Sequence, residues 1–432
     1  MSEYLEKVSI STFHYTLLIS LALGWAFDAM CAGLISTVTA PLEKEWNLSP
    51  TMMGLLLSCW LVGMLLGGIS IGRLADLIGR KKASITALLL FSVPTGLVAT
   101  SRGPFDVAIL RLLAGIGSSG YMVVASTLLS EYIPARRRGS FVAFLESSWA
   151  FGWLLAMYFG RILAPEKGWR AVFFAGFLPL IVLPLIMLKV PESLRYLEEK
   201  GRFTEMKRVL SLLNLKLETR TQRAIRKEKS KISELFSSKY RKRTFMLWIH
   251  WFCIVLAYWG IFLWLPRILY GYGISFVRSL DYAIIITLAQ IPGYWSGALL
   301  IDKIGRKSIL ASYMTLAGIG SYLFAISRSE IEVLIWAIIV SFFNLGAWGA
   351  TYAYTPELYP TRIRGTGAGS ANSVGRVGGI VGPYLVGALL ELTRGNTYLI
   401  FLVFSIVHII SAVTVALLGE ETKGRILEEI SE

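Results

Sequence analysis

Four charged side chains, Asp28, Arg111, Glu146 and Arg376, stand inside long apolar stretches of the chain. Asp28 lies about 14 residues into the first of these stretches, which is roughly 21 Å along a helix. An ionised group at that depth costs several kcal/mol unless it is paired, hydrated or protonated. These charged residues within apolar segments therefore predict one of two functions, the transfer of a proton or the binding of a charged solute.

The buried acids suit proton transfer. Asp28 is interpreted as a proton-titrating or cation-binding carboxylate, with a structural ion pair to a buried base as the alternative. Arg111 is expected at a depth that Asp28 can share, and a facing base would let the carboxyl group switch between its charged and protonated forms. Glu146 lies about 10 Å into its stretch and either relays protons or braces the charged loops described below. The predicted proton-coupling residues are Asp28, Arg111 and Glu146.

Arg376 predicts solute binding, because a guanidinium group in an apolar stretch needs an anionic partner. That partner is either a substrate carboxylate held by two parallel hydrogen bonds or an acid of the chain itself. The aromatic side chains around Trp251–Gly260 suit a flat or apolar solute. Trp153 is predicted either to bind the solute or only to pack against neighbouring helices. The predicted substrate-binding residues are Arg376, Asn344, Tyr354, Trp259, Gln290 and Trp153.

Membrane helices must position these residues. The chain of 432 residues is 55% hydrophobic and 16% charged, with a mean hydropathy of +0.60, whereas soluble domains carry about 25% charged residues. This composition excludes an ordinary soluble enzyme, and no phosphate-binding Walker loop is present. Twelve apolar runs of roughly 18–25 residues predict an all-α integral membrane protein with twelve transmembrane helices. The runs lie near 14–38, 51–71, 83–101, 105–128, 140–162, 169–189, 244–266, 280–300, 308–326, 332–355, 367–390 and 397–418.

The net charge of +15 does not indicate nucleic-acid binding, because the bases gather in alternate loops. The segment 191–243 alone carries 16 Lys/Arg against 7 Glu. An excess of bases marks cytoplasmic loops, so this segment and both termini are expected in the cytoplasm of a plasma-membrane protein. The segment is expected to form short amphipathic helices whose bases hold anionic lipid. Cys31, Cys59 and Cys253 lie inside apolar runs and indicate neither a disulfide framework nor a metal site, and no cofactor is expected.

Two charged patterns recur with the same offset. Gly72–Lys82 reads GRLADLIGRKK, and the acid and base of its centre return 226 positions later in Ile301–Lys307. Glu131–Gly139 and Glu357–Gly365 share Glu, Pro, two Arg and Gly, again 226 positions apart. Two motifs with one offset predict a chain that arose by duplication of a half of about 200 residues, as in transporters built from internal repeats.

The pattern G-x-L-A-D-x-x-G-R-K-K in Gly72–Lys82 resembles the signature loop between helices 2 and 3 of the major facilitator superfamily, with Leu77 in place of the usual base. The resemblance implies two pseudo-symmetric six-helix halves, 1–190 and 244–432, joined by the linker 191–243, that work by alternating access. The loop charges are then interpreted as a cytoplasmic gate, with static charges that fix the topology as the alternative. The predicted gate residues are Asp76, Arg80, Glu131, Arg138, Glu192, Arg195, Asp302, Arg306, Glu357 and Arg364.

Two stretches resemble prokaryotic metabolite:proton symporters of the niacin, benzoate and organic-ion type. They are Gly24–Met30 in the first apolar run and Asn344–Gly369. Such relatives often carry a second acid three residues after the position of Asp28, where this chain has Cys31.

Other stretches are similar to sugar porters. Pro191–Leu197 and Glu421–Gly424 resemble their cytoplasmic motifs, and in those relatives a base at the position of Arg111 pairs with the acid of the first helix. However, Trp251–Gly260 lacks the pair of glutamines with which sugar porters hold hydroxyl groups.

These observations predict a secondary active transporter that carries a small organic solute together with protons, above all an organic or aromatic acid. A sugar:proton symporter and a multidrug or organic-cation transporter are the alternatives. The expected partners are the small-molecule substrate, protons and membrane lipid, without nucleic acid, and the protein is expected to be a monomer.

Overall fold

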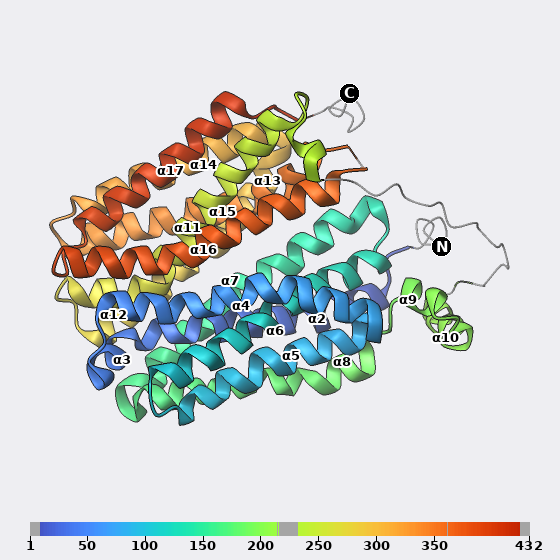
Figure 1. Cartoon of the computed structure of the whole chain (residues 1–432), viewed down its shortest axis with the longest axis horizontal. Helices are drawn as coiled ribbons and strands as arrows, with labels where there is room; N and C mark the ends of the chain where they lie inside the picture. Colours follow the sequence, from blue (N-terminus) through green and yellow to red (C-terminus); the bar gives the residue numbers. More distant parts are fainter. Residues whose placement is uncertain (1–8, 214, 216–231, 361, 424–432) are drawn as a thin grey trace. The chain divides into compact units, whose positions relative to one another are not determined.

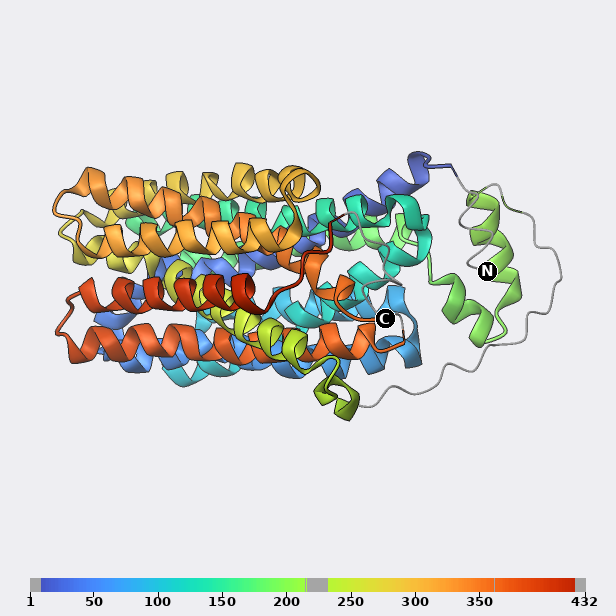
Figure 2. The same ribbon diagram turned by 90° about the horizontal axis from the view of Figure 1, so that it is seen from above.

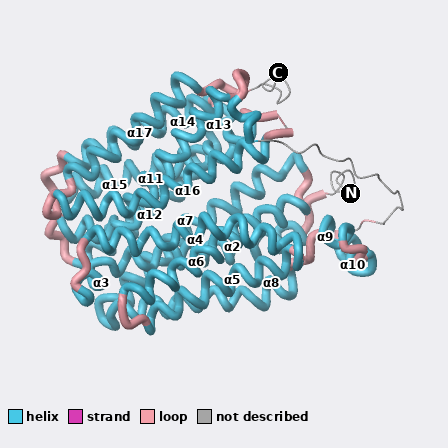
Figure 3. The backbone as a smooth tube through the Cα atoms, in the orientation of Figure 1, coloured by secondary structure: helices cyan, strands magenta, loops and turns pink. Residues whose placement is uncertain are grey.

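The computed structural model describes residues 9–213, 215, 232–360 and 362–423 (Figure 1). Figure 3 shows helices joined by short loops, and no strand occurs in these ranges. Long apolar runs give this result because a helix satisfies the backbone hydrogen bonds of an apolar segment internally. The prediction of an all-α architecture is therefore confirmed.

The helices follow one another along the chain as α2 (Thr12–Gly33), η1 (Leu34–Val38), α3 (Thr39–Trp46), α4 (Pro50–Ile78), α5 (Arg80–Leu97), η2 (Val98–Thr100), α6 (Pro104–Tyr132), α7 (Ala135–Phe174), η3 (Ala175–Val182), α8 (Leu183–Lys189), α9 (Leu194–Glu199), α10 (Phe203–Leu212), η4 (Ile232–Phe236), α11 (Arg241–Gly271), α12 (Phe276–Leu288), α13 (Gln290–Ile304), α14 (Arg306–Ala325), α15 (Glu330–Glu357), α16 (Arg364–Leu392) and α17 (Tyr398–Leu418).

Eleven segments of the described chain are long and apolar enough to cross a membrane. One of them, Arg136–Lys189, has 54 residues and would measure about 81 Å as a single helix, against about 30 Å for a hydrocarbon core. This segment breaks at Gly168, where φ is 79°, a backbone conformation that favours glycine. It then continues through η3 and α8. It therefore contains the fifth and sixth predicted crossings, and all twelve predicted crossings are present.

The helices continue beyond the apolar runs into the charged motifs. α4 extends to Ile78 and α5 begins at Arg80, so the turn within Gly72–Lys82 is reduced to Gly79. The repeat has the same form, because α13 ends at Ile304 and α14 begins at Arg306. The charged residues of these motifs are therefore held on rigid helix ends and not on flexible loops.

The chain forms two compact units. Unit 1 consists of Met1–Leu34, Val62–Ala156 and Arg170–Ile225, and unit 2 consists of Ile35–Leu61, Met157–Trp169 and Arg226–Glu432. In unit 1, α5 and α6 pack along their length, and a Cβ at Gly117 would lie 2.4 Å from the backbone nitrogen of Phe91. Such glycines let two helix backbones approach closely.

In unit 2, α11 packs on α16 and α14 packs on α17, as Figures 1 and 2 both show. A Cβ at Gly378 of α16 would lie 2.4 Å from the carbonyl oxygen of Phe252 in α11. Close helix contacts of this kind fix the rotation of each helix, and thereby the direction of its polar side chains.

Two short helices, α9 and α10, occupy the first part of the segment 191–243. The side chains of Leu194, Tyr196 and Leu197 are buried, and the hydroxyl of Tyr196 donates to the carbonyl of Leu77 at the end of α4. α9 is thereby attached to the helices of unit 1. Residues 214 and 216–231 of this segment lie outside the described residues, and the 3-10 helix η4 follows them at Ile232–Phe236.

Candidate functional site

Asp28 is fully buried near the end of α2, and a residue of α6 binds its carboxylate. The hydroxyl of Ser118 donates a hydrogen bond to Oδ2 of Asp28 at 3.0 Å. Both side chains are sealed from solvent. Ser118 was not predicted from the sequence, because a serine within an apolar helix carries no signal of its own.

Arg111 is also fully buried, and it binds the backbone of α2. Its Nη1 donates to the carbonyl of Cys31 at 2.9 Å and its Nη2 donates to the carbonyl of Ala32 at 3.0 Å. α2 ends at Gly33 and continues as the 3-10 helix η1. Carbonyl groups at a helix end need additional donors, and a cation is favourable there. Arg111 therefore fixes the end of α2 at the third and fourth residues after Asp28.

One face of α6 supplies all of these contacts. Arg111, Ser118 and Tyr121 lie seven and three residues apart, which places them on one side of a helix. The hydroxyl of Tyr121 donates to the carbonyl of Leu21 at 3.1 Å. A Cβ at Gly24 would lie 2.0 Å from this hydroxyl oxygen, so the approach requires glycine. The polar face of α6 therefore fastens α2 at three levels.

The other predicted proton-coupling and substrate-binding residues of unit 1, Glu146 and Trp153, lie on α7. Trp153 is buried and stacks on Trp149, with ring centroids 6.3 Å apart. A Cβ at Gly33 would lie 3.3 Å from the indole ring of Trp153, so this tryptophan packs against the end of α2. Glu146 is half-buried, two turns before Trp153 on the same helix.

Four rings of unit 2 form an aromatic cluster, which consists of Trp251, Tyr258, Trp348 and Tyr352. Trp251 meets Trp348 edge to face, with ring centroids 5.9 Å apart, and meets Tyr352 at 5.3 Å. Trp348 lies 5.8 Å from Tyr258 and 5.8 Å from Tyr352. These separations are typical of attractive aromatic pairs. α11 and α15 therefore present a joint aromatic surface.

The hydrogen bonding of the two indole groups in the cluster differs. Nε1 of Trp251 donates to the hydroxyl of Thr355 at 2.9 Å. Nε1 of Trp348 is buried and has no hydrogen-bond partner among the described residues. A buried donor without an acceptor is costly, so this N–H group is available to a ligand or a water molecule.

Two other predicted substrate-binding residues are buried polar amides. Nδ2 of Asn344 lies 3.1 Å from Nε2 of His408. Nδ1 of His408 faces the carbonyl of Phe404 at 2.6 Å and must donate to it, so Nε2 accepts from Asn344. Both amide atoms of Gln290 are buried without a hydrogen-bond partner in the described chain.

The last three predicted substrate-binding residues occupy different surroundings. The hydroxyl of Tyr354 donates to the carbonyl of Glu420 at 2.6 Å, beyond the end of α17. Trp259 is buried, with its ring 5.5 Å from that of Tyr258. Arg376 is half-buried on α16. Of these three, Trp259 adjoins the aromatic cluster directly.

His250 is a buried residue that was not predicted from the sequence. Its Nδ1 lies 2.7 Å from the hydroxyl of Ser411, and its Nε2 lies 2.7 Å from the hydroxyl of Thr351. The hydroxyl hydrogen of Thr351 is already donated to the carbonyl of Ala347, so Nε2 must be the donor to Thr351. His250 thereby ties α11 to α15 and α17, one residue along the chain from Trp251 of the aromatic cluster.

The predicted gate residues of unit 1 form the N-terminal charge cluster, defined as Asp76, Arg80, Glu131, Arg138 and Glu192. Nε of Arg80 lies 3.0 Å from Glu131, with both side chains largely buried, and Nη2 of Arg80 lies 3.9 Å from the exposed Asp76. Arg138 donates to the carbonyl of Ile133 at 3.3 Å. The structure thus joins Arg80 to both predicted acids of its own repeat.

Arg195, also predicted for the gate, lies apart from the contacts of Arg80. Its Nε bonds the exposed Glu199 of the same helix at 3.2 Å.

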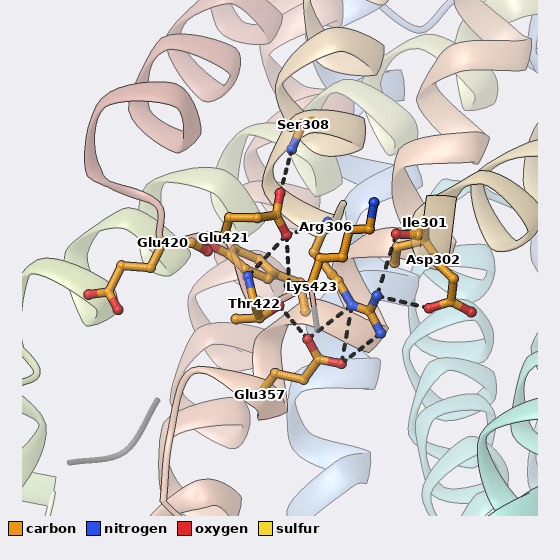
Figure 4. A network of polar contacts seen from close by, with 10 residues as sticks. Ile301, Asp302, Arg306, Ser308, Glu357, Glu420, Glu421, Thr422 and Lys423 are labelled. Carbon is orange, nitrogen blue, oxygen red and sulfur yellow. Dashed lines mark hydrogen bonds and ion pairs between the residues drawn. The ribbon is translucent and has the colours of Figure 1, made fainter. Parts of the chain in front are cut away.

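The repeat reproduces this arrangement in the C-terminal charge cluster, defined as Asp302, Arg306, Glu357, Arg364 and Glu421 and shown in Figure 4 except for Arg364. Arg306 lies 3.2 Å from Glu357 and 2.8 Å from Asp302. Arg364 donates to the carbonyl of Tyr359 at 3.3 Å, as Arg138 does to Ile133. The offset of 226 positions therefore preserves contacts as well as residue types.

Glu192 and Glu421 have a role that was not predicted from the sequence. The carboxylate of Glu192 accepts from the backbone N–H groups of Arg80 and Lys81 at 2.7 and 3.2 Å, at the start of α5. Glu421 accepts from the N–H group of Arg306 at 2.8 Å, at the start of α14 (Figure 4). An anion at a helix N-terminus satisfies free N–H groups and interacts favourably with the helix dipole.

These carboxylates also explain the glycine of each motif. Gly79 and Gly305 have φ values of 97° and 110°, which other residues adopt rarely. A Cβ at Gly79 would lie 2.2 Å from a carboxylate oxygen of Glu192, and one at Gly305 would lie 2.3 Å from Glu421. The glycine thus gives both the turn and the space for the capping carboxylate.

Glu421 lies beyond the last apolar helix, and its ionisation reflects the cap. Partial burial raises the pKa of its carboxyl group, but hydrogen bonds from the backbone N–H groups of Lys423, Arg306, Ser308 and Thr422 outweigh this effect. The pKa of Glu421 is therefore lower than its usual value, and the cap is charged at neutral pH.

Two ion pairs of unit 2 were not expected from the sequence. Nε of Arg267 lies 2.6 Å from Glu43, with both side chains mostly buried. Nε of Arg161 lies 2.6 Å from Asp281, and these side chains are more exposed. The partners are 224 and 120 positions apart, so no local pattern could have indicated them.

Comparison with known proteins agrees with this architecture. The family model described as "Sugar (and other) transporter" matches residues 18–432. The chain is 40% identical to the niacin transporter NiaP of Acinetobacter baylyi, over 99% of this chain and 98% of that protein. It is 39% identical to the putative niacin/nicotinamide transporter NiaP of Bacillus subtilis, over 94% and 96% of the two chains. It is 30% identical to the gallate transporter of Pseudomonas putida, over 91% and 90%.

The fold is similar to that of a solved transporter. The partially occluded inward open structure of the xylose transporter XylE from E. coli superposes with a TM-score of 0.77 at 18% sequence identity, covering 96% of this chain and all of that chain. At this identity the likeness shows the fold alone. With a family model that spans nearly its whole length and relatives at 40% identity, the chain belongs to the sugar (and other) transporter family of the major facilitator superfamily and is a membrane transporter of a small-molecule substrate, not an enzyme.

Proposed function

We propose that this transporter takes up a small aromatic acid of the nicotinate type together with protons, by alternating access. The proposal narrows the substrate to a flat ring that bears a carboxylate. The names of the relatives, which include niacin and gallate transporters, support this substrate class.

The aromatic cluster carries the proposal. Trp251, Trp348 and Tyr352 offer ring faces and edges at separations suited to stacking. The unpartnered indole N–H group of Trp348 adds one buried donor, which a carboxylate or a ring nitrogen can accept. A sugar would need many directional hydrogen bonds, which a surface of this kind does not supply.

Further charged and polar residues complete the proposed substrate contacts. Arg376 binds the substrate carboxylate through two parallel hydrogen bonds, and an internal acid remains the alternative partner for its guanidinium group. Gln290 has a buried amide group without a partner in the described chain and supplies a donor and an acceptor. The other proposed contacts are Asn344, Tyr354, Trp259 and Trp153.

Asp28 carries the proton in this proposal, with Arg111 and Glu146 as further coupling residues. Complete burial favours the neutral form of a carboxyl group, whereas nearby donors favour the charged form. A carboxyl group poised between the two can take up a proton on one side of the membrane and release it on the other.

The two charge clusters form the proposed cytoplasmic gate, together with Arg195. The proposal places both clusters, both termini and the linker on the cytoplasmic side of the plasma membrane, because of their excess of bases. Basic residues of the linker would hold anionic lipid, and the transporter would act as a monomer of two six-helix halves.

Binding of defined solutes to the purified protein tests the substrate class. Thermal-shift and tryptophan-fluorescence titrations would compare nicotinate, nicotinamide, benzoate and xylose. We expect nicotinate and benzoate to bind more tightly than nicotinamide, which has the ring but not the charge, and xylose not to bind. Binding of xylose but of neither acid would support sugar transport instead.

Variants of one ring test the aromatic cluster. Trp348→Phe keeps a ring but removes the N–H group and should weaken nicotinate binding about tenfold, as expected for a hydrogen bond to a charged group. Trp248→Phe is the matched control, because the indole N–H group of Trp248 is bonded to Ser370 in the same unit.

Uptake of labelled nicotinate into proteoliposomes with and without an imposed pH gradient tests proton coupling.

A further inference from the structure

We propose that Ser118 is a positioning residue for proton coupling, whose hydroxyl group hydrogen-bonds Asp28 in both the charged and the protonated state. This inference rests on the proposed role of Asp28 as proton carrier. It adds a residue that neither the charge pattern nor the sequence motifs single out.

The geometry places the hydroxyl group on the carboxylate in the interior of unit 1. The oxygen of Ser118 lies 3.0 Å from Oδ2 of Asp28. Neither side chain is exposed. Since water does not reach the pair, protein groups must serve both protonation states of the carboxyl group.

The nearby ionisable groups also donate to acceptors other than Asp28. Two guanidinium nitrogens of Arg111 donate to carbonyl groups of α2. The hydroxyl of Tyr121 donates to the carbonyl of Leu21, and the thiol of Cys31 donates weakly to the carbonyl of Gly176 at 3.9 Å. Tyr121 and Cys31 both lie close enough to Asp28 for electrostatic interaction.

The other helices that contact α2 bring few titratable groups. α5 and α8 carry them only at their ends, as Arg80, Lys81 and Lys82 and as Lys189, and η3 carries none. α7 contacts α2 where Gly152 meets the backbone of Ala26, and the nearest titratable residues along the helix are Glu146 and Tyr158, six positions to either side. The hydroxyl group of Ser118 on α6 is a direct partner whose hydrogen bond can respond when Asp28 is protonated.

A hydroxyl group suits this task because it both donates and accepts. An ionised carboxylate only accepts, and the Ser118 hydroxyl donates to it in the structure. After protonation the carboxyl group carries a hydrogen that needs an acceptor, which a guanidinium group cannot provide. Ser118 can accept this hydrogen and turn its own toward the carbonyl group of Ala114, four residues earlier, as serines in helices commonly do.

The consequence is that proton binding and release need no separation of α2 from α6. Only two hydrogens change position, while the heavy atoms stay in contact. Without the hydroxyl group, both forms of Asp28 lose a partner in a dry site, and the cycle of protonation is impaired.

Transport by purified protein in proteoliposomes tests the inference. Labelled nicotinate would be followed in two modes, accumulation driven by a pH gradient and exchange without a gradient, and a pH-sensitive dye inside the vesicles would report proton entry. Ser118→Ala should lower accumulation and nicotinate-induced proton entry about tenfold, the effect of one hydrogen bond to a charged group. Exchange should stay near the wild-type rate, which also shows that the variant is folded.

Two further variants separate the hydroxyl chemistry from packing. Ser118→Thr keeps the hydroxyl group and should restore accumulation, whereas Ser119→Ala, the neighbouring serine, should behave like the wild type. Normal accumulation by Ser118→Ala would overturn the inference. Loss of exchange together with accumulation in Ser118→Ala would also overturn it, because Ser118 would then be a structural or substrate-binding residue.

Asp28→Asn distinguishes this inference from the proposed function. If Asp28→Asn accumulates nicotinate normally, the proposed proton carrier is wrong and the role of Ser118 falls with it. If Asp28→Asn loses accumulation but keeps exchange, while Ser118→Ala accumulates normally, only the inference about Ser118 is overturned.

Discussion

Glu357 and Asp302 both contact Arg306, yet the structure predicts different consequences when each loses its charge. Glu357 accepts from Arg306 at 3.2 Å and from the hydroxyl of Thr422 at 2.6 Å, and its side chain is 22% exposed. Asp302 lies closer to Arg306, at 2.8 Å, but its side chain is 76% exposed. The sequence motif alone gives the two acids the same weight, whereas burial separates them.

The expected magnitudes follow from this difference. Hydrogen bonds to a charged group that is partly buried contribute about 1.5–3 kcal/mol, and an exposed ion pair contributes about 0–1 kcal/mol. We therefore expect Glu357→Gln to lower the free energy of unfolding by about 2 kcal/mol and Asp302→Asn by less than about 0.5 kcal/mol. For a protein of this size the first change corresponds to a decrease in Tm of roughly 2 °C.

The assay compares thermal unfolding of the two variants in the same detergent. If the C-terminal charge cluster is part of a cytoplasmic gate, Glu357→Gln should also increase the labelling rate of a cysteine introduced at Asn372 by a membrane-impermeant maleimide from the cytoplasmic side. The three native cysteines would be replaced by alanine for this experiment. Equal effects of the two variants on Tm would refute the reasoning from burial, and unchanged labelling would reduce Glu357 to a structural role.

The N-terminal charge cluster provides an independent repeat of this experiment. Arg80 contacts the largely buried Glu131 at 3.0 Å and the exposed Asp76 at 3.9 Å. Glu131→Gln should therefore resemble Glu357→Gln, and Asp76→Asn should produce the smaller change in both stability and labelling.

Three further predictions concern other charged groups. Asp28→Asn should still bind and exchange nicotinate but no longer accumulate it. Arg376→Ala should abolish nicotinate binding, and Arg376→Lys should weaken it, because lysine keeps the charge but not the planar fork. If binding titrations show that Arg376→Ala binds nicotinate and Asp28→Asn does not, the two roles are reversed. Because the pKa of Glu421 is lowered in the folded state, its contribution to stability is present at neutral pH and is lost as the pH falls through that pKa; the difference in Tm between wild type and Glu421→Gln should therefore shrink in acid. Glu43→Ala leaves the largely buried Arg267 without its carboxylate and should lower the Tm, and a double variant that exchanges the two charges should recover part of the loss.

Much of the architecture could be predicted from the sequence. The twelve crossings are read from runs of apolar residues, because the length of a helix that spans a membrane depends on local composition. The stretch Arg136–Lys189 was also divided correctly, because the runs 140–162 and 169–189 lie on either side of the break at Gly168. The duplication could also be predicted, because Arg80 and Arg306 occur in the same motif. The structure shows that both make the same contacts with acids of their own repeat.

The partners of the buried residues could not be predicted in the same way. The sequence indicated that Asp28 and Arg111 are buried, but the contacts of Asp28 with Ser118 and of Arg111 with the end of α2 depend on how α6 is rotated and shifted against α2. A periodic apolar pattern leaves these two quantities open, because several rotations bury an equally apolar face.

The capping roles of Glu192 and Glu421 show the same limit. Both acids stand in recognisable motifs, but their partners are backbone N–H groups more than 100 positions away, and backbone groups carry no sequence signal. The sequence by itself therefore determined which segments cross the membrane, which charges are unusual and to which family the chain belongs. Only the tertiary structure decided which atoms satisfy those charges, since that depends on the relative rotation, depth and close approach of helices that are distant in the chain.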